Sequence, residues 1–209
     1  MKNEIEIIYA DDALVVANKP SMLLSVPGRG ADKQDCLISR LSVDFPSILT
    51  VHRLDWETSG LIVLALNKEV LRHLSRQFQE RQVHKNYTAV VYGTPDKDSG
   101  EINLPLRCDW ENRPRQIVDY QQGKAAQTFW QSLSSETNAT RLLLTPVTGR
   151  SHQLRVHMQA IGHPILGDRL YAHAEAFAMA ERLLLHATLL EFTHPKSNQT
   201  VKFYSRPPF

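Results

Sequence analysis

The run Leu61–Leu66, LIVLAL, is continuously apolar and is bounded by Gly60 and Asn67. A short apolar run with such boundaries is typical of a strand that is buried on both faces. The residues before it, Val51–Gly60, read VHRLDWETSG and place Asp55 close to an arginine. Since loops presented by a rigid sheet often hold reactive groups, the pattern predicts a buried core strand preceded by a candidate reactive loop. The plainer alternative is a solvated turn with an incidental aspartate.

Predicted strands outnumber predicted helices along the rest of the chain. Helical patterns indicate three helices, over Cys36–Phe45, Lys68–Gln82 and Arg150–Ile161. Apolar runs predict strands over Ile5–Tyr9, Leu14–Asn18, Lys85–Tyr92, Leu183–Phe192 and Val201–Tyr204, with several short ones between Ile102 and Leu144. This order indicates an α+β fold, with a mixed, largely antiparallel sheet and flanking helices. Because no linker divides the pattern, we expect a single domain over residues 1–209.

The composition indicates a soluble protein with a sizeable core. The chain has 209 residues, 42% of them hydrophobic, and a net charge of only +2. A nucleic-acid partner must therefore be bound by a local basic surface rather than by total charge. The start of the chain lacks the apolar segment of a signal peptide, and no run approaches the ~18 apolar residues of a spanning helix. The distant Cys36 and Cys108 suit a reducing compartment, so we expect a cytoplasmic protein.

Several motifs together resemble the RluA-type family of pseudouridine synthases. The run His52–Gly60 is similar to the family signature His-Arg-Leu-Asp-x-x-Thr-Ser-Gly. The other matching segments, in the expected order, are Asn18–Pro20, Leu24–Gly28, the tyrosine motif Lys85–Tyr87, the arginine motif Thr148–His157, Gly162–Asp168 and Leu183–Ala187. They span nearly the whole chain. The resemblance implies the fold of a pseudouridine synthase catalytic domain and an enzyme that isomerises uridine to pseudouridine in RNA, with no cofactor and no metal.

The resemblance assigns three catalytic residues. Asp55 matches the family's catalytic aspartate, Arg155 the arginine that pairs with it, and Tyr87 the tyrosine that stacks on the target base. A neighbouring cation favours the ionised form of a carboxylate in a cavity, so we expect an Asp55–Arg155 ion pair. A stacking platform contributes ~1–3 kcal/mol per base. The plainer alternatives are a solvated helix arginine and a core tyrosine. Whether Asp55 attacks the sugar, attacks the ring or abstracts a sugar proton stays open.

The resemblance also implies residues that bind the RNA and the extruded base. Arg53 is similar to the family arginine that enters the RNA where the base departs, and its planar guanidinium suits stacking. Leu185 matches an aliphatic residue that packs beside the uracil, although any buried strand leucine has the same appearance. His52 and Arg150, from the same motifs, are assigned to RNA binding with them.

The residue pattern itself indicates a further RNA contact around Trp110. Arg113 and Arg115, with Arg107, surround this aromatic residue, and cations interleaved with an aromatic ring suit phosphate contact and base stacking. The alternative is an ordinary charged hairpin tip. Three more arginines, Arg72, Arg76 and Arg81, are better explained as the solvated face of an amphipathic helix.

Other classes of function fit the sequence less well. His152 and His157 are five residues apart, not the four that place two metal ligands on one helical face, and no carboxylate or cysteine cluster accompanies them. A glycoside hydrolase needs two carboxylates beside the scissile bond, and Asp55 and Glu57 are the one tempting pair. A serious alternative is an RNA-binding protein on the same scaffold that has lost catalysis.

The RNA targets follow from the closest resemblance within the family. Many relatives carry an S4-like RNA-binding domain before the catalytic segment, and we expect that module to be absent because the chain starts directly at the catalytic segment. The resemblance to family members without this module implies a dual specificity, for the anticodon stem-loop of tRNA (position 32) and a hairpin of 23S rRNA (position 746). Both offer an unstacked loop uridine. Related synthases act on other RNAs, which stays an alternative, and a monomer is the default.

Overall fold

Strand β4 (Ser59–Ala65) is buried at every residue in the computed structural model, which describes residues 5–209. The apolar run predicted such a strand. The strand begins two residues before the apolar run, so that Ser59 and Gly60 of the candidate reactive loop are part of the strand itself. The loop is therefore anchored directly on the core.

The chain folds into two compact units. The first takes in the described residues up to Lys85 together with His186–Pro208, and the second takes in Asn86–Leu185 with Phe209. The chain passes from one unit to the other within β5 (His84–Tyr92) and at the start of β11 (Leu185–Thr193). The prediction of a single domain over residues 1–209 stays a prediction.

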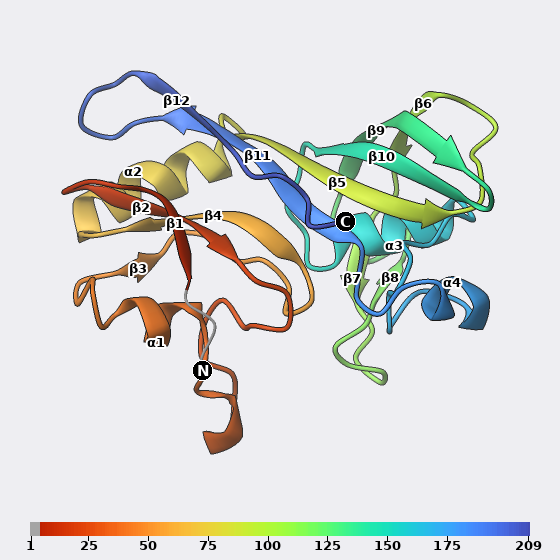
Figure 1. The fold of residues 1–209 in the computed structure, drawn as a ribbon, viewed down its shortest axis with the longest axis horizontal. Helices are drawn as coiled ribbons and strands as arrows, with labels where there is room; N and C mark the ends of the chain where they lie inside the picture. Colours follow the sequence, from red (N-terminus) through yellow and green to blue (C-terminus); the bar gives the residue numbers. More distant parts are fainter. Residues whose placement is uncertain (1–4) are drawn as a thin grey trace. The chain divides into compact units, whose positions relative to one another are not determined.

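The first unit is a mixed sheet built around β4 (Figure 1). Strand β2 (Leu14–Lys19) pairs antiparallel along its whole length with β4, and β11 pairs with β4 in parallel through His186 and Ala187. Three more strands complete this sheet: β1 (Glu6–Ala10) on β2, β3 (Leu49–Thr50) on β4 and β12 (Thr200–Tyr204) on β11.

Helix α2 (Lys68–Gln79) covers this sheet because its apolar residues recur on one face. Val70 and Leu74 pack into the cluster formed by Val16, Leu61 and Val63. Asn67 caps the helix, with its side-chain oxygen accepting a hydrogen bond from the Val70 N–H at 2.9 Å. The unit also contains the short helices η1 (Ala31–Lys33) and α1 (Leu37–Leu41).

Gly60 sits where the backbones of β4 and β11 meet. Its φ of +111° lies in the region that favours glycine, and a Cβ built there would meet the Ala187 carbonyl oxygen at 2.3 Å. Any side chain at this position would push the two strands apart. The glycine of the Thr-Ser-Gly run is therefore explained by strand packing.

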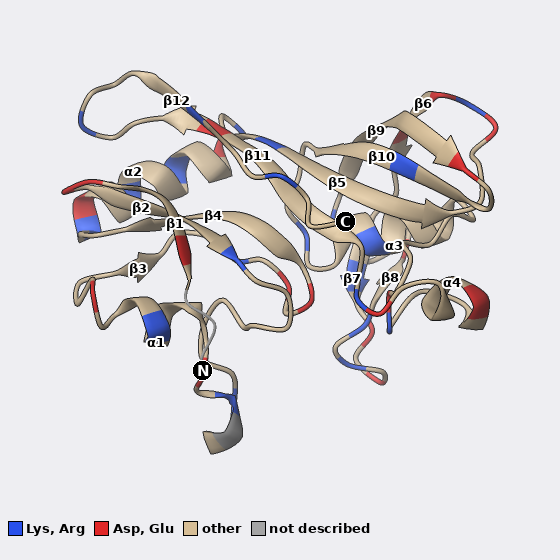
Figure 2. Cartoon of the chain, viewed as in Figure 1, with Lys and Arg blue, Asp and Glu red and all other residues tan. Residues whose placement is uncertain are grey.

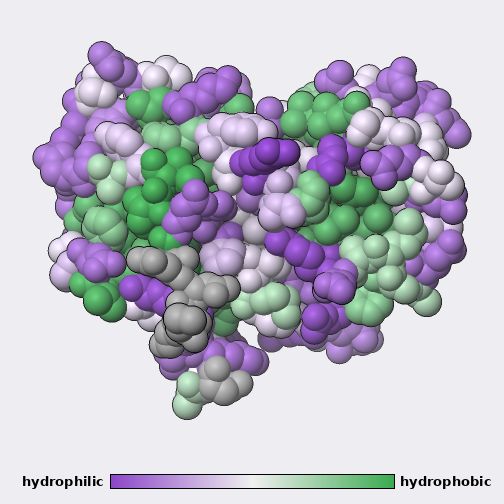
Figure 3. Space-filling model, viewed as in Figure 1, coloured by the Kyte–Doolittle hydropathy of each residue, from purple (hydrophilic) through white to green (hydrophobic). Residues whose placement is uncertain are grey.

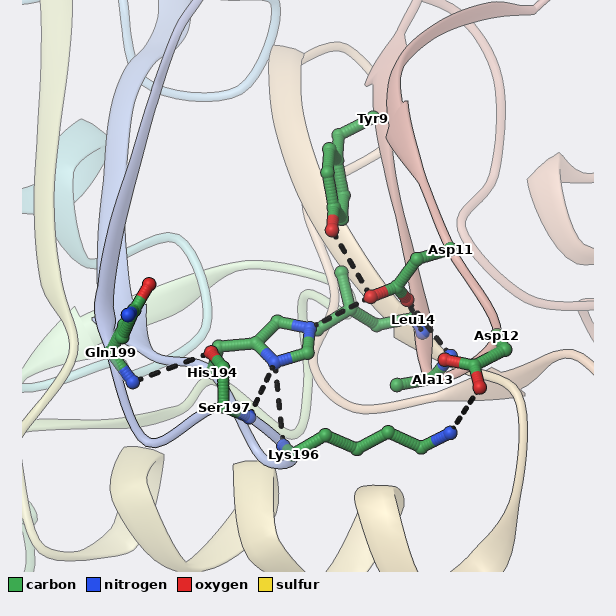
Figure 4. A network of polar contacts seen from close by, with 9 residues as sticks. All are labelled: Tyr9, Asp11, Asp12, Ala13, Leu14, His194, Lys196, Ser197 and Gln199. Carbon is green, nitrogen blue, oxygen red and sulfur yellow. Dashed lines mark hydrogen bonds and ion pairs between the residues drawn. The ribbon is translucent and has the colours of Figure 1, made fainter.

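A polar network ties the β1–β2 turn to the β11–β12 turn within the first unit (Figure 4). His194 and Tyr9 both contact Asp11 Oδ2 at 3.0 Å, and Asp11 Oδ1 accepts the N–H groups of Ala13 and Leu14. Partial burial acts to raise the pKa of Asp11, but these hydrogen bonds and the nearby His194 hold it below its usual value.

The second unit is an antiparallel sheet with helices and a separate hairpin. Strand β10 (Ala139–Pro146) pairs with β5 on one side and with β9 (Gln127–Glu136) on the other, and β6 (Ser99–Asn103) follows β9. The hairpin of β7 (Leu106–Cys108) and β8 (Gln116–Val118) forms its own two-stranded sheet.

Two helices complete the second unit. Helix α3 (Gln153–Ala160) buries Leu154 and Met158 against the core of the sheet, and α4 (Ala174–Ala178) is a short helix further along the chain. The strands and helices of the two units confirm the predicted α+β class and its largely antiparallel sheet.

Boundaries differ from the predictions at the helix ends. Helix α2 ends at Gln79 rather than Gln82, because Arg81 adopts a left-handed φ of +59°. Helix α3 begins at Gln153 rather than Arg150, because His152 is also left-handed, with φ +53°. Helix α1 spans Leu37–Leu41, shorter than the predicted Cys36–Phe45. Neither β3 nor α4 was predicted, since both are too short for a period to register.

The surface is mixed in character. On the face drawn in Figure 3, patches of hydrophobic residues alternate with hydrophilic ones. Among the described residues 5–209, no helix has the length and apolar character needed to cross a membrane.

Candidate active site

The loop between β3 and β4 presents alternating side chains. Leu54 and Glu57 are buried, whereas Arg53 and Trp56 are exposed and Asp55 is partly exposed. The buried residues anchor the loop in the first unit, and the other three are accessible to a ligand. The sequence motif thus folds into a short segment that displays the predicted carboxylate.

A buried lysine holds this loop in place. Lys19, fully buried at the end of β2, donates hydrogen bonds from Nζ to the carbonyl oxygens of Leu23 (2.8 Å), Pro20 (2.9 Å) and Trp56 (3.3 Å). An ammonium group out of water needs such acceptors, and carbonyls that lose it are left without a partner. Lys19 therefore joins the opening segment to the residue that directly follows Asp55.

Two serines of the opening segment reinforce the same loop. Ser25 Oγ bonds both the carbonyl oxygen (2.9 Å) and the N–H (3.1 Å) of Leu54, and Ser21 Oγ donates to the Glu57 carbonyl oxygen at 2.6 Å. These contacts fix the backbone on both sides of Asp55. The matching opening segment in the sequence thus has a physical role, which is to hold the loop that carries Asp55.

His52 packs inside the first unit. Its Nε2 accepts a hydrogen bond from the Val63 N–H at 3.2 Å, and its ring stacks on Phe78 with 4.5 Å between centroids. Burial, together with the nearby Lys85 ammonium, lowers the pKa of His52 to about 3. The ring is thus neutral at physiological pH and attaches the loop to β4 and α2. The assignment of His52 to RNA binding stays a prediction.

A buried chain of polar groups fixes the end of the loop. Ser59 Oγ contacts His186 Nδ1 at 2.8 Å, and His186 Nε2 contacts Ser205 Oγ at 3.0 Å. All three side chains are buried. A serine beside a histidine suggests a nucleophile and its base, but burial of all three makes this chain a tie between strands rather than a site for a substrate.

In the second unit, Arg155 on α3 forms a buried ion pair. Its Nε and Nη2 atoms bind Asp168 Oδ2 and Oδ1, each at 2.7 Å, and the two side chains are 2% and 0% exposed. Asp168 Oδ1 also accepts the N–H groups of Leu170 and Tyr171. Two parallel charge-assisted bonds fix the guanidinium plane. The geometry therefore presets the orientation of Arg155.

The segment before α3 is shaped by Gln153. Its Oε1 accepts from Thr148 Oγ1 at 2.7 Å and from the Arg150 N–H at 3.0 Å, and its Nε2 donates to the Gln127 carbonyl oxygen at 2.9 Å. Arg150 itself is exposed, with Nε donating to the Ala125 carbonyl oxygen at 3.1 Å. The arginine motif thus forms a turn that leads into the helix.

Tyr87 and Leu185 lie at the core of the second unit. Tyr87 stands on β5 opposite Leu144, partly buried against the hydrophobic cluster that contains Leu185. Leu185 is itself a buried member of this cluster. Both positions satisfy the plainer packing interpretation, and their roles beside the uracil stay predictions.

The tip of the β7–β8 hairpin carries the cluster predicted to contact RNA. The Arg113 guanidinium lies over the Trp110 ring, with Cζ 3.9 Å from its centroid, and Arg113, Arg115 and Trp110 are all exposed. Charges of both signs line this hairpin (Figure 2). The stacked pair offers a flat cationic surface, the form that suits a phosphate or an unstacked base.

The hairpin itself is stiffened by an ion pair. Arg107 Nε lies 2.5 Å from Asp119 Oδ2, and Asp119 Oδ1 accepts the N–H groups of Gln121 and Gln122. The Arg107 guanidinium and these backbone bonds lower the pKa of Asp119 to about 2. Arg107 therefore supports the hairpin, while Arg113 and Arg115 extend from its tip.

The predicted residues are distributed over both units. Asp55, Arg53 and His52 belong to the first, and the second contains Tyr87, Arg150, Arg155, Leu185, Arg113 and Arg115. The expected Asp55–Arg155 ion pair stays a prediction. The sequence had assigned no role to Lys19 or Asp168, although both lie in matched motifs, because the contacts of Lys19 with Trp56 and of Asp168 with Arg155 form only in the folded chain.

The described residues 5–209 contain no group of three or more histidine, cysteine or acidic side chains arranged to hold a metal ion. Cys36 and Cys108 are both free thiols.

Sequence comparison gives a family match and close relatives. A family described as RNA pseudouridylate synthase matches residues 13–160. "Dual-specificity RNA pseudouridine synthase RluA" of Escherichia coli (strain K12) is 52% identical over 204 residues, which cover 97% of this chain and 93% of that protein. The protein of the same name from Yersinia pestis is 53% identical over 204 residues, covering 97% and 99%.

Solved structures share the fold. "Human RNA Pseudouridylate Synthase Domain Containing 1" superposes with a TM-score of 0.82 at 30% identity, covering 99% of this chain and 84% of that one. "Human RNA Pseudouridylate Synthase Domain Containing 4" gives a TM-score of 0.79 at 26% identity, covering 97% and 88%.

Replacing Lys19 by methionine should destabilise the protein. The methionine fills a similar volume but leaves three carbonyl oxygens without their donor, so we expect the free energy of unfolding to fall by about 2–4 kcal/mol. Chemical denaturation measures this change. The matched control is Lys33→Met, since Lys33 is exposed and surface changes stay within about 0.5 kcal/mol. Equal stability of Lys19→Met and the control would show that the carbonyl contacts of Lys19 contribute nothing.

The stability of the protein should depend on His52 in mildly acidic solution. Because the folded-state pKa of His52 is about 3 and that of a free histidine is about 6.5, the unfolded state binds more protons between these values. The stability that His52 contributes is therefore complete above about pH 6.5. As the pH falls from 6.5 toward 3, the free energy of unfolding decreases by at most about 1.4 kcal/mol per pH unit. Urea denaturation of His52→Gln between these limits should give a shallower pH dependence than wild type.

The control for this experiment is His84→Gln, because His84 is exposed at the start of β5. It should follow the wild-type pH profile. Parallel profiles for wild type and His52→Gln would contradict the neutral state of the packed ring.

Proposed function

This chain belongs to the RNA pseudouridylate synthase family, and from that membership we propose that it modifies two different RNAs, a tRNA anticodon stem-loop and a hairpin of 23S rRNA. As a member of the family it is an enzyme that isomerises uridine to pseudouridine in RNA. The dual specificity extends this statement to particular substrates.

Identity along the chain carries the proposal. Relatives named as dual-specificity RNA pseudouridine synthases are 52–53% identical to it over 97% of its length. The motif resemblance supplies the targets, position 32 of tRNA and position 746 of 23S rRNA. One site can serve both if it reads the shape of a loop and one extruded uridine rather than a long sequence.

The reaction needs no reagent from outside. The N1–C1′ bond breaks, the uracil turns over, and C5 bonds to C1′, so that C5 loses its hydrogen while N1 gains one. Substrate and product are isomers, and no oxidant, reductant or group donor takes part. Side chains that hold the base, stabilise charge and move a proton are therefore enough, which supports a mechanism without cofactor or metal.

Asp55 is the proposed catalytic carboxylate, with Arg155 as its cation and Tyr87 as the platform for the base. A guanidinium has five N–H donors, more than one carboxylate can accept. The bonds to Asp168 fix the plane of the Arg155 guanidinium, which supports a role for Arg155 in orienting a second anionic group.

The RNA is proposed to be bound by exposed cations on both units. Arg53 follows His52 on the catalytic loop, and the guanidinium suits insertion beside an unstacked base. Arg113 and Arg115 at the β7–β8 tip, with Arg150, offer phosphate contacts. Leu185 is proposed to pack beside the uracil. With a net charge of only +2, these local groups must supply the attraction.

We also propose that the enzyme acts in the cytoplasm as a monomer. The two free cysteines suit a reducing compartment. A monomer is the simplest state for an enzyme whose proposed site residues all come from one chain.

Replacing Asp55 by asparagine should abolish catalysis. The amide keeps the shape of the carboxylate but neither attacks nor takes up a proton, so we expect the rate to fall by about 10³-fold or more. The measurement is tritium release from C5 of labelled uridine in the two stem-loops, each tested alone. Wild type should act on both and the variant on neither, while RNA affinity stays unchanged.

The control is Asp12→Asn, an exposed aspartate on the β1–β2 turn, which should keep full activity. Unchanged turnover by Asp55→Asn would reject the carboxylate mechanism. A wild-type enzyme that binds both RNAs and releases no tritium would instead favour the scaffold without catalysis. Release from one stem-loop alone would reject the dual specificity.

Arg113→Ala and Arg115→Ala should each weaken RNA binding through lost phosphate contacts. The slope of log affinity against log salt should become shallower by about 1 for each arginine that contacts a phosphate. Filter binding over a range of salt concentrations measures this slope. The matched control is Arg72→Ala, an exposed arginine on α2, which should leave the slope unchanged. Identical slopes for all three variants would remove the hairpin tip from the RNA interface.

A further inference from the structure

Tyr171 connects the β7–β8 hairpin to helix α3 within the second unit. Its side chain is only 4% exposed and packs in a small cluster with Leu106 of β7, Ala126 and Val156 of α3. None of the proposed catalytic or RNA-binding residues belongs to this cluster. Tyr171 is therefore not explained by the reaction described above.

The hydroxyl group of Tyr171 bridges two segments. It accepts a hydrogen bond from the N–H of Gln116, the first residue of β8, at 2.8 Å, and it lies 2.6 Å from His152 Nδ1. A phenol can accept from one partner and donate to another at once. One oxygen thus links the hairpin to His152, the residue that directly precedes α3.

The same tyrosine also borders Arg155. The Arg155 guanidinium carbon lies 5.2 Å from the centre of the Tyr171 ring. The Tyr171 N–H donates to Asp168 Oδ1 at 3.1 Å, and that carboxylate forms both bonds to Arg155. A shift of Tyr171 would therefore change both the packing of its ring against the Arg155 guanidinium and the hydrogen bond from its N–H to Asp168.

His152 holds a conformation that needs support. Its φ of +53° is left-handed, which costs a non-glycine residue free energy unless the surroundings enforce it. Its side chain does not cap the helix but contacts the Tyr171 hydroxyl instead. Three residues later on the same helix comes Arg155. The contact with Tyr171 thus sets how α3 begins and how Arg155 is presented.

At the other end, the bridge reaches the base of the hairpin tip. Gln116 directly follows Arg115, and the tip is closed by the bonds from the Asp109 N–H to the Arg115 carbonyl oxygen (2.9 Å) and from the Arg115 N–H to the Asn112 carbonyl oxygen (3.0 Å). A ligand that fixes the tip therefore also restricts the backbone at Gln116, whose N–H donates to the Tyr171 hydroxyl.

We propose that Tyr171 is a positioning residue that couples RNA contact at the β7–β8 tip to the orientation of Arg155. This rests on the proposed function, in which the tip binds RNA and Arg155 serves catalysis. RNA held by Arg113 and Arg115 fixes the start of β8. The Tyr171 hydroxyl then fixes His152, and the Tyr171 ring and backbone keep the Arg155–Asp168 pair in register. A correctly bound RNA thereby favours the catalytic arrangement over an incorrectly bound one.

The test is Tyr171→Phe, which removes the hydroxyl and keeps the ring. At saturating RNA, we expect kcat to fall by about five- to tenfold, the effect of one lost hydrogen bond, while RNA affinity stays within twofold of wild type, about the scatter of such measurements. The matched control is Tyr120→Phe, because Tyr120 is 78% exposed on the turn after β8. It should leave both quantities unchanged.

Combination with Arg113→Ala separates coupling from a structural role. If Tyr171 transmits the tip contact, Arg113→Ala lowers kcat in the wild-type background but not in Tyr171→Phe, although it weakens binding in both. Equal effects of Arg113→Ala on kcat in the two backgrounds would overturn the proposal. So would a loss of kcat in Tyr171→Phe that only follows a loss of folded protein in thermal melts.

A second variant keeps the proposal testable if Tyr171→Phe does not fold. His152→Asn removes the ring contact, and asparagine tolerates the left-handed conformation, so the same cycle with Arg113→Ala applies. Failure of the proposed function has a different signature. In that case wild type itself makes no pseudouridine, whereas failure of the coupling leaves an active wild type and additive variants.

Discussion

A buried cation must be matched by acceptors that do not move, and the pair of Arg155 and Asp168 meets this requirement in the second unit. With both side chains almost fully buried, the two charges have lost their hydration, and only close, well-aligned bonds compensate for that loss. Two bonds of 2.7 Å and the further N–H groups of Leu170 and Tyr171 supply the alignment. The turn around Asp168 and the start of α3 therefore cannot shift independently.

The turn itself depends on one glycine. Gly167 has a φ of +70°, and a Cβ built there would lie 2.0 Å from the Arg182 carbonyl oxygen. No other residue lets the chain pass so close and still direct Asp168 inward. In the Gly-Asp dipeptide, Gly167 thus allows the close approach to the Arg182 backbone, and Asp168 neutralises the buried Arg155.

In the first unit, a buried cation is stabilised by backbone dipoles. Lys19 has its ammonium group surrounded by backbone carbonyl oxygens, including that of Trp56 on the loop between β3 and β4. The loop is thereby tied to the buried strands while Arg53, Trp56 and part of Asp55 stay accessible. A rigid loop suits an isomerase, because positioning and preorganised charge both lower the barrier to reaction.

The sequence by itself determined the elements whose signal is local, and it singled out candidates for the reacting groups. The continuous apolar run of β4 and the amphipathic face of α2 are local signals, so both elements were predicted correctly in kind. The loop motif around Asp55 is also contiguous, which let the sequence indicate it as a candidate site, and its role stays a prediction. Tertiary structure decided the rest. Lys19 and Trp56 are 37 positions apart, Arg155 and Asp168 are 13 apart, and Gln116 and Tyr171 are 55 apart. No periodicity relates such positions, because the chain brings them together only when the sheets have formed. The left-handed His152, which delays the start of α3, has the same origin: the packing around Tyr171 and Gln153 enforces a conformation that local propensity disfavours.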